Sequence, residues 1–158
     1  MLDPVFHCEF AAFAPLLKQE SAFFTRALQA AFVAASVPDK IYTVDIILTD
    51  AAALQKLNRD FRGKDRPTNV LSFPQIEDVA ALASLPEPVA LGDIFLAYET
   101  LAAEAVQQGK SLRNHVAHLL VIGFWPLVGY DHQNDVEAEE MEALEIKILA
   151  HLGIQNPY

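Results

Sequence analysis

Apolar residues recur along this chain with two different periods, which predict a mixture of helices and strands. Spacings of three and four residues indicate helices, and short runs rich in β-branched and aromatic residues indicate strands. Helices are expected over 15–36, 51–58, 99–108 and 134–153. Strands are expected over 5–10, 41–48, 68–73 and 91–96. The stretch 75–88 has no clear period and is expected to form a flexible surface loop with room for a helical turn.

A fifth helix is expected in the most apolar part of the chain. Ser111 has the side chain of an N-cap, and His115 and His118 follow at helical spacing among almost wholly apolar neighbours. Proline has no backbone N–H and cannot continue a helix without loss of a hydrogen bond. Pro126 therefore predicts a kink or an early end of this helix near Trp125.

The residues after this helix have the character of a metal-binding turn. Gly129 can take a left-handed conformation, and the chain then reads Tyr130, Asp131 and His132. A helix that leads into such a turn can hold a metal, because two ligands four residues apart share one helix face and a third returns from the turn. The stretch 115–132 is thus the first place to look for chemistry.

Length and composition limit the class of protein. At 158 residues the chain is expected to form a single domain, 1–158. The longest apolar run of this stretch, 119–130, is interrupted by Gly123, Pro126 and Gly129, and it is too short to span a membrane. The amino terminus lacks the basic start of a secretory signal, and the single Cys8 cannot build a disulfide framework, so a cytoplasmic location is expected.

The net charge of −10 argues against a protein that coats nucleic acid indiscriminately, because phosphate binding depends on Lys and Arg. The positive charges are nevertheless clustered. The eleven residues 56–66 hold five of the eleven basic side chains: Lys56, Arg59, Arg62, Lys64 and Arg66. Such a local basic patch on an acidic protein can bind and orient an RNA strand.

Four blocks of sequence resemble the YbeY-type family of bacterial metal-dependent endoribonucleases. The segment 57–74, LNRDFRGKDRPTNVLSFP, matches the family's second block, and 91–94 and 137–145 match in the same order. The family signature H-G-x-L-H-x-x-G-Y-D-H aligns with 122–132, where Gly123 and the run Gly129 to His132 agree. Ile122 and Pro126 stand where the family has its first two histidines, so His132 is the only family ligand retained.

The resemblance implies an α+β fold, with a small mixed β-sheet covered by about five helices. It also implies a role in ribosomal RNA maturation and ribosome quality control, through zinc-dependent cleavage of single-stranded RNA, with ribosome-associated proteins as further partners. The family places an arginine of the R-G-K-D block near the metal, and the match here is Arg62. Arg62 is therefore the candidate catalytic residue, and Arg59, Arg62, Lys64 and Arg66 are the candidate RNA-binding residues.

The two replacements change the chemistry that is expected. Neither isoleucine nor proline carries a side-chain donor atom for zinc, and one lone imidazole keeps only a minor share of a full site's affinity. The leading hypothesis is therefore a family member that keeps its fold and RNA contacts but has weak or no hydrolytic activity. Two alternatives stay open: an active enzyme with a rearranged site of His118, Asp131 and His132, and an RNA-, ribosome- or protein-binding module without catalysis.

Several residues have a structural interpretation instead. His115 and His118 are expected to be core or helix-surface histidines, Trp125 to fill volume, and Asn69 to make strand-end hydrogen bonds. His132 is equally well explained as a remnant ligand or as a histidine capped by Asp131. The glutamates of the last helix are expected to form a solvated face: Glu137, Glu139, Glu140, Glu142 and Glu145.

Overall fold

A mixed four-stranded sheet forms the centre of the molecule in the computed structural model, which describes residues 1–130 and 133–158. The strand order is β1-β2-β4-β3, in which β1, β2 and β4 are parallel and the edge strand β3 is antiparallel to β4. The strands are β1 (Leu2–Cys8), β2 (Tyr42–Thr49), β3 (Val70–Pro74) and β4 (Val89–Ala97). The sheet confirms the expected mixed α+β architecture.

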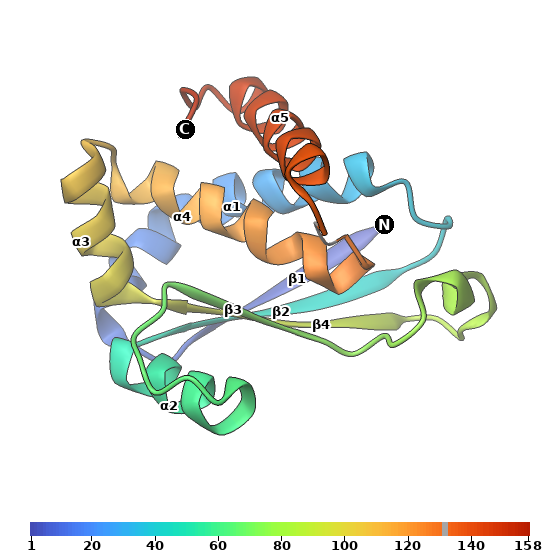
Figure 1. Cartoon of the computed structure of the whole chain (residues 1–158), viewed down its shortest axis with the longest axis horizontal. Coiled ribbons are helices and arrows are strands. Elements are labelled where there is room, and N and C mark those ends of the chain that lie inside the picture. Colours follow the sequence, from blue (N-terminus) through green and yellow to red (C-terminus); the bar gives the residue numbers. More distant parts are fainter. Residues whose placement is uncertain (131–132) are drawn as a thin grey trace.

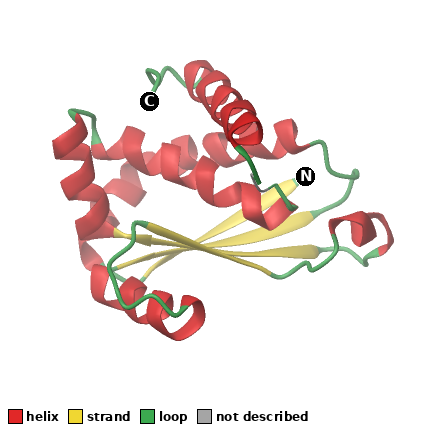
Figure 2. Cartoon of the chain, viewed as in Figure 1, coloured by secondary structure: helices red, strands yellow, loops and turns green. Residues whose placement is uncertain are grey.

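Helices cover both faces of the sheet (Figures 1 and 2). In the described residues there are five α-helices: α1 (Ala14–Ala35), α2 (Ala51–Arg62), α3 (Tyr98–Gln108), α4 (Leu112–Phe124) and α5 (Asp135–His151). There are also three short 3-10 helices: η1 (Ala11–Phe13), η2 (Val79–Ser84) and η3 (Trp125–Val128). Helices α1 and α4 lie on one face with α5 above them, whereas α2 lies on the opposite face (Figure 1). None of the described helices is both long and apolar enough to cross a membrane.

Three of the predicted strands lie within two residues of their observed ends, and the first is displaced. Strand β1 begins at Leu2 and ends at Cys8, whereas 5–10 was expected. The reason is that the backbone N–H groups of Glu9 and Phe10 both donate to the carbonyl of Leu48, so the ladder with β2 stops there. The chain then turns into η1.

Helix α2 continues to Arg62, four residues beyond the predicted end at Asn58, so the predicted end was wrong. Within this added turn, the ring of Phe61 lies edge-on to Phe73, with 5.7 Å between the ring centroids. Asp50 caps the start of α2, where its side chain accepts from the N–H of Ala53. Gly63 ends it in a left-handed conformation (φ 67°).

The end of α4 agrees with the effect expected of proline. The helix ends at Phe124, and the next residues form the 3-10 turn η3, which contains Pro126. Gly129 closes this turn in a left-handed conformation (φ 82°), and an added Cβ there would lie 2.4 Å from Val79 Cγ2. Val79 is the first residue of η2, which lies in the stretch 75–88 that was expected to be a flexible loop. Leu82 of η2 is buried in the core.

Candidate functional site

Three of the four predicted RNA-binding side chains lie in one surface pocket. The pocket has a volume of about 440 Å³ and lies between the end of α2 and the start of β3. Arg62, Lys64 and Arg66 line it, together with Asn58 and a few smaller side chains. Arg59 does not line this pocket; its guanidinium pairs with Asp60 at 3.1 Å instead. We refer to this site, with Arg62, Lys64 and Arg66 as its cations, as the basic pocket.

Arg62 is held in place by contacts with the edge strand β3. Its Nη2 donates to the carbonyl of Ser72 at 2.7 Å, and its guanidinium carbon lies 5.6 Å from the centre of the Phe73 ring. The bond to Ser72 uses one of the five N–H donors of a guanidinium. An arginine positioned in this way, while exposed to solvent, is well suited to bind a phosphate.

Asn58 shapes the loop that carries the other two cations. Its side chain is buried and donates to the carbonyl of Arg66 at 3.0 Å, and its own carbonyl accepts from the N–H of Lys64 at 3.1 Å. Sequence reasoning assigned Asn58 no role beyond the end of a helix. A polar residue at a position that faces the core was the available signal, because a buried amide needs hydrogen-bond partners.

Ser72 connects the basic pocket to α4, the helix in which the family signature begins. While its carbonyl accepts from Arg62, its buried hydroxyl donates to the carbonyl of Gly123 on α4 at 2.6 Å. Gly123 permits this close approach, because an added Cβ would lie 3.0 Å from Ile94 Cγ2 and 3.1 Å from Val70 Cγ2. The second block and the signature block are therefore adjacent in space through one serine.

The two positions at which the family resemblance predicts histidines, Ile122 and Pro126, line a second pocket. Ile122 and Pro126 both contribute to its wall, in a volume of about 300 Å³ between the end of α4 and α5. Neither side chain carries a donor atom for a metal. Within 1–130 and 133–158, no three His, Cys, Asp or Glu side chains are grouped so that they could hold a metal ion. The predicted ligands Asp131 and His132 lie outside the described residues.

His115 and His118 are buried on α4, as expected of core histidines. The Nε2 atom of His115 lies 2.9 Å from the Glu104 carboxylate, and that of His118 lies 3.2 Å from the Tyr158 hydroxyl. Burial lowers the pKa of both side chains; that of His118 falls to about 4, with a further contribution from the positive charge of Lys110. Both imidazoles are therefore neutral at pH 7.

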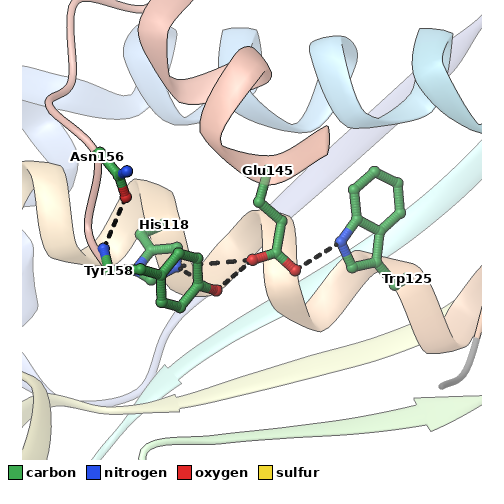
Figure 3. Close-up of polar contacts among 5 residues, drawn as sticks. All are labelled: His118, Trp125, Glu145, Asn156 and Tyr158. Carbon is green, nitrogen blue, oxygen red and sulfur yellow. Dashed lines mark hydrogen bonds and ion pairs between the residues drawn. The ribbon is translucent and has the colours of Figure 1, made fainter. Parts of the chain in front are cut away.

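The expectation that Glu145 belongs to a solvated face was wrong. This residue is only 4% exposed, and its carboxylate accepts hydrogen bonds from the indole N–H of Trp125 at 3.1 Å and from the Tyr158 hydroxyl (Figure 3). Glu145 follows Leu144 and precedes Ile148 by three residues, so it falls on the inner stripe of α5. That position was the available signal for burial, and sequence reasoning missed it.

Two further structural interpretations are confirmed. Trp125 is almost fully buried and fills space between α4 and α5. Asn69 makes hydrogen bonds at the start of β3, where its side chain donates to Glu104 at 3.1 Å and its carbonyl accepts from the N–H of Ala97. Tyr158, to which sequence reasoning gave no role, joins His118 to Glu145 (Figure 3).

Comparison with known proteins gives a consistent result. A family model described as "Endoribonuclease YbeY" matches residues 15–153. The endoribonuclease YbeY of Paramagnetospirillum magneticum is 54% identical over 125 residues, which cover 79% of this chain and 76% of that protein. The endoribonuclease YbeY of Sphingopyxis alaskensis is 52% identical over 130 residues, which cover 80% and 77%.

A solved structure has the same fold. The solution structure of TM1509 from Thermotoga maritima superposes with a TM-score of 0.56 and covers 96% of this chain and 89% of its own. Its sequence is only 22% identical, so the likeness concerns the arrangement of helices and strands.

Proposed function

Because this chain belongs to the YbeY endoribonuclease family, we propose that it binds single-stranded RNA, and ribosomal RNA in particular, through the basic pocket. The observation that carries this proposal is the convergence of Arg62, Lys64 and Arg66 on one pocket of an otherwise acidic molecule. Cytoplasmic ribosomes and ribosome-associated proteins are the setting in which such a substrate would be met.

The electrostatics favour a local contact over general attraction to nucleic acid. The net charge of −10 repels phosphates at long range, whereas three cations within one pocket attract them at short range. Arginine forms two parallel hydrogen bonds to phosphate oxygens, and Arg62 is held by Ser72 before any ligand arrives. The chain should therefore bind an RNA strand at a defined place.

We also propose that hydrolysis is weak or absent. A zinc ion bound in an intact family site would activate a water molecule and polarise the phosphate. The described residues do not fit such a site, because Ile122 and Pro126 lack donor atoms and His118 lies beside the Tyr158 hydroxyl. What remains to this chain is binding and orientation of RNA by Arg62 and its neighbours, without activation of the attacking water.

RNA binding is tested by the matched pair Arg62→Ala and Arg59→Ala, which remove the same charge from the end of α2. Arg62→Ala should weaken binding of a short single-stranded RNA by about tenfold and reduce the salt dependence by about one counterion. Arg59→Ala should weaken RNA binding by less than about threefold, which is less than half of the effect of Arg62→Ala on a logarithmic scale. Equal losses in the two variants, measured by fluorescence anisotropy, would mean that the basic pocket is not the binding site.

The loss of hydrolysis is tested by metal content and cleavage of single-stranded RNA. The chain should hold well under one zinc per molecule and should cleave RNA no faster after zinc is added. The double variant Ile122→His, Pro126→His should bind about one zinc and gain cleavage that a chelator abolishes, since it restores two imidazoles four residues apart. If the unaltered chain already holds about one zinc and a chelator stops its cleavage, a rearranged site of His118, Asp131 and His132 replaces this proposal.

A further inference from the structure

Phe61 lies on the inner side of α2 but remains open to solvent. Leu54, Asn58 and Phe61 recur at spacings of four and three residues, which places them on one side of the helix. Leu54 and Asn58 are buried, whereas Phe61 is 69% exposed. All ten phenylalanines of the sequence lie in the described residues, and Phe61 is the only exposed one. A large apolar ring is therefore left largely uncovered at a position that the helix directs inward.

A row of aromatic side chains holds the Phe61 ring in place. The ring lies edge-on to Phe73 on β3, with 5.7 Å between the centroids, and Phe73 lies edge-on to Phe95 on β4, with 5.5 Å. Phe73 and Phe95 pack in turn against a small buried cluster that includes Leu54. An edge-to-face contact covers at most one face of a ring. Phe61 therefore keeps a free face, while a packed neighbour fixes its orientation.

Arg62 connects this aromatic row to the basic pocket. Its guanidinium carbon lies 5.6 Å from the centre of the Phe73 ring, the same ring that Phe61 contacts, and Arg62 also lines the pocket. Leu71, a further residue of the pocket wall, lies two residues before Phe73 on β3, so both side chains point to the same face of the sheet. Phe61 and the cations of the basic pocket therefore lie on one continuous surface.

We propose that Phe61 is a stacking platform for a base of the RNA strand whose phosphates lie in the basic pocket. The inference rests on the proposed function, because the phosphate contact at Arg62 brings the base to the ring. Every nucleobase has a π-face, and stacking on aromatic side chains binds single strands with little dependence on sequence. The bases of a duplex are already paired and stacked on one another, so the ring selects unpaired nucleotides. The ligand is thus an unpaired nucleotide, held at both its phosphate and its base.

An oligomer without bases tests the proposal on the unaltered protein. A short single-stranded RNA is compared by fluorescence anisotropy with an oligomer of abasic tetrahydrofuran nucleotides that has the same number of phosphates. RNA should bind at least about fivefold more tightly, as expected from one stacked base. Equal affinity for the two oligomers would refute the proposal, because phosphates alone would then account for binding.

Variants of Phe61 separate stacking from charge and from apolar contact. Phe61→Ala should weaken RNA binding by about fivefold or more and should change binding of the abasic oligomer by less than about twofold. The salt dependence should stay that of the parent chain, whereas Arg62→Ala reduces it by about one counterion. Phe61→Leu keeps an apolar side chain without a π-face and should bind RNA nearly as weakly as Phe61→Ala. Phe61→Trp should retain the affinity of the parent chain or exceed it.

Val106→Ala is the matched control, because it shortens another exposed apolar side chain, on α3, that does not line the basic pocket. It should change RNA binding by less than about twofold, and melting curves verify that each variant is folded. Equal weakening of both oligomers by Phe61→Ala, or RNA binding by Phe61→Trp that is no tighter than that of Phe61→Ala, would refute the stacking role. The proposed function fails separately, if Arg62→Ala leaves binding of the abasic oligomer unchanged.

Discussion

Replacement of Ser72 by alanine tests the link between the basic pocket and α4. The Ser72 hydroxyl is buried and donates to the Gly123 carbonyl at 2.6 Å. Loss of such a bond costs about 1 kcal/mol on average, and a buried acceptor left without its partner raises the cost toward 2 kcal/mol. Ser72→Ala should therefore lower the free energy of unfolding by about 1–2 kcal/mol, which for a chain of this size lowers the melting temperature by about 2–8 °C.

Ser84→Ala is the matched control. The Ser84 hydroxyl also donates to a backbone carbonyl, that of Ala81 at 2.9 Å, but this residue is exposed and water can replace the bond. Its loss should change the free energy of unfolding by less than about 0.5 kcal/mol. Urea denaturation followed by circular dichroism measures both variants under the same conditions.

Ser72→Ala also has a consequence for RNA binding. Arg62 donates to the backbone carbonyl of Ser72, which alanine retains, so any change must come from movement of β3 relative to α4. We expect RNA affinity to fall by about two- to fivefold, less than the loss caused by removal of Arg62 itself. The reasoning is wrong if Ser72→Ala is as stable as the parent chain, or if Ser84→Ala costs as much.

Other variants test separate parts of the structure. The folded state lowers the pKa of His118 to about 4, so the unfolded chain binds more protons than the folded chain between pH 6.5 and 4. The free energy of unfolding should therefore fall by about 3 kcal/mol as the pH falls through this range. His118→Gln should reduce that fall, which urea titrations at several pH values measure. Gly123→Ala should lower the melting temperature, although alanine favours helices, because its methyl group would crowd Ile94 and Val70; a higher melting temperature would refute the tight packing. Trp125→Phe should cost about 2–3 kcal/mol in chemical denaturation, because Glu145 loses a buried N–H donor; a cost below about 0.5 kcal/mol would contradict that role.

The sequence was sufficient for most of the local structure because its signals are local. Asp50, Ser111 and Asn134 cap helices as their side chains indicate, and each accepts from a backbone N–H in the first turn. Pro126 ends α4 because proline has no backbone N–H to donate to the helix, which is a property of this one residue. The end of α2 had a local signal as well, because Gly63 closes the helix in a left-handed conformation, and the predicted end at Asn58 missed that signal.

The candidate site was predictable in part. The clustering of basic residues in 56–66 indicated Arg62, Lys64 and Arg66 as candidates, and the fold brings these three into one pocket and leaves Arg59 outside it. The roles of Ser72, Asn58 and Glu145 depend on pairings between distant segments, such as Ser72 with Gly123 and Glu145 with Trp125. Such pairings require the three-dimensional arrangement, since separate stretches of the chain supply the two partners.

The bond from Arg62 to the Ser72 carbonyl has a consequence for solubility. Strand β3 is an edge of the sheet, and its outward backbone groups could pair with a strand of another molecule. Arg62 occupies one of these carbonyls and places a positive charge against the edge, which discourages a second chain from adding there. The side chain proposed to bind RNA therefore also protects the protein against self-association, so the two demands on this arginine cannot be changed independently.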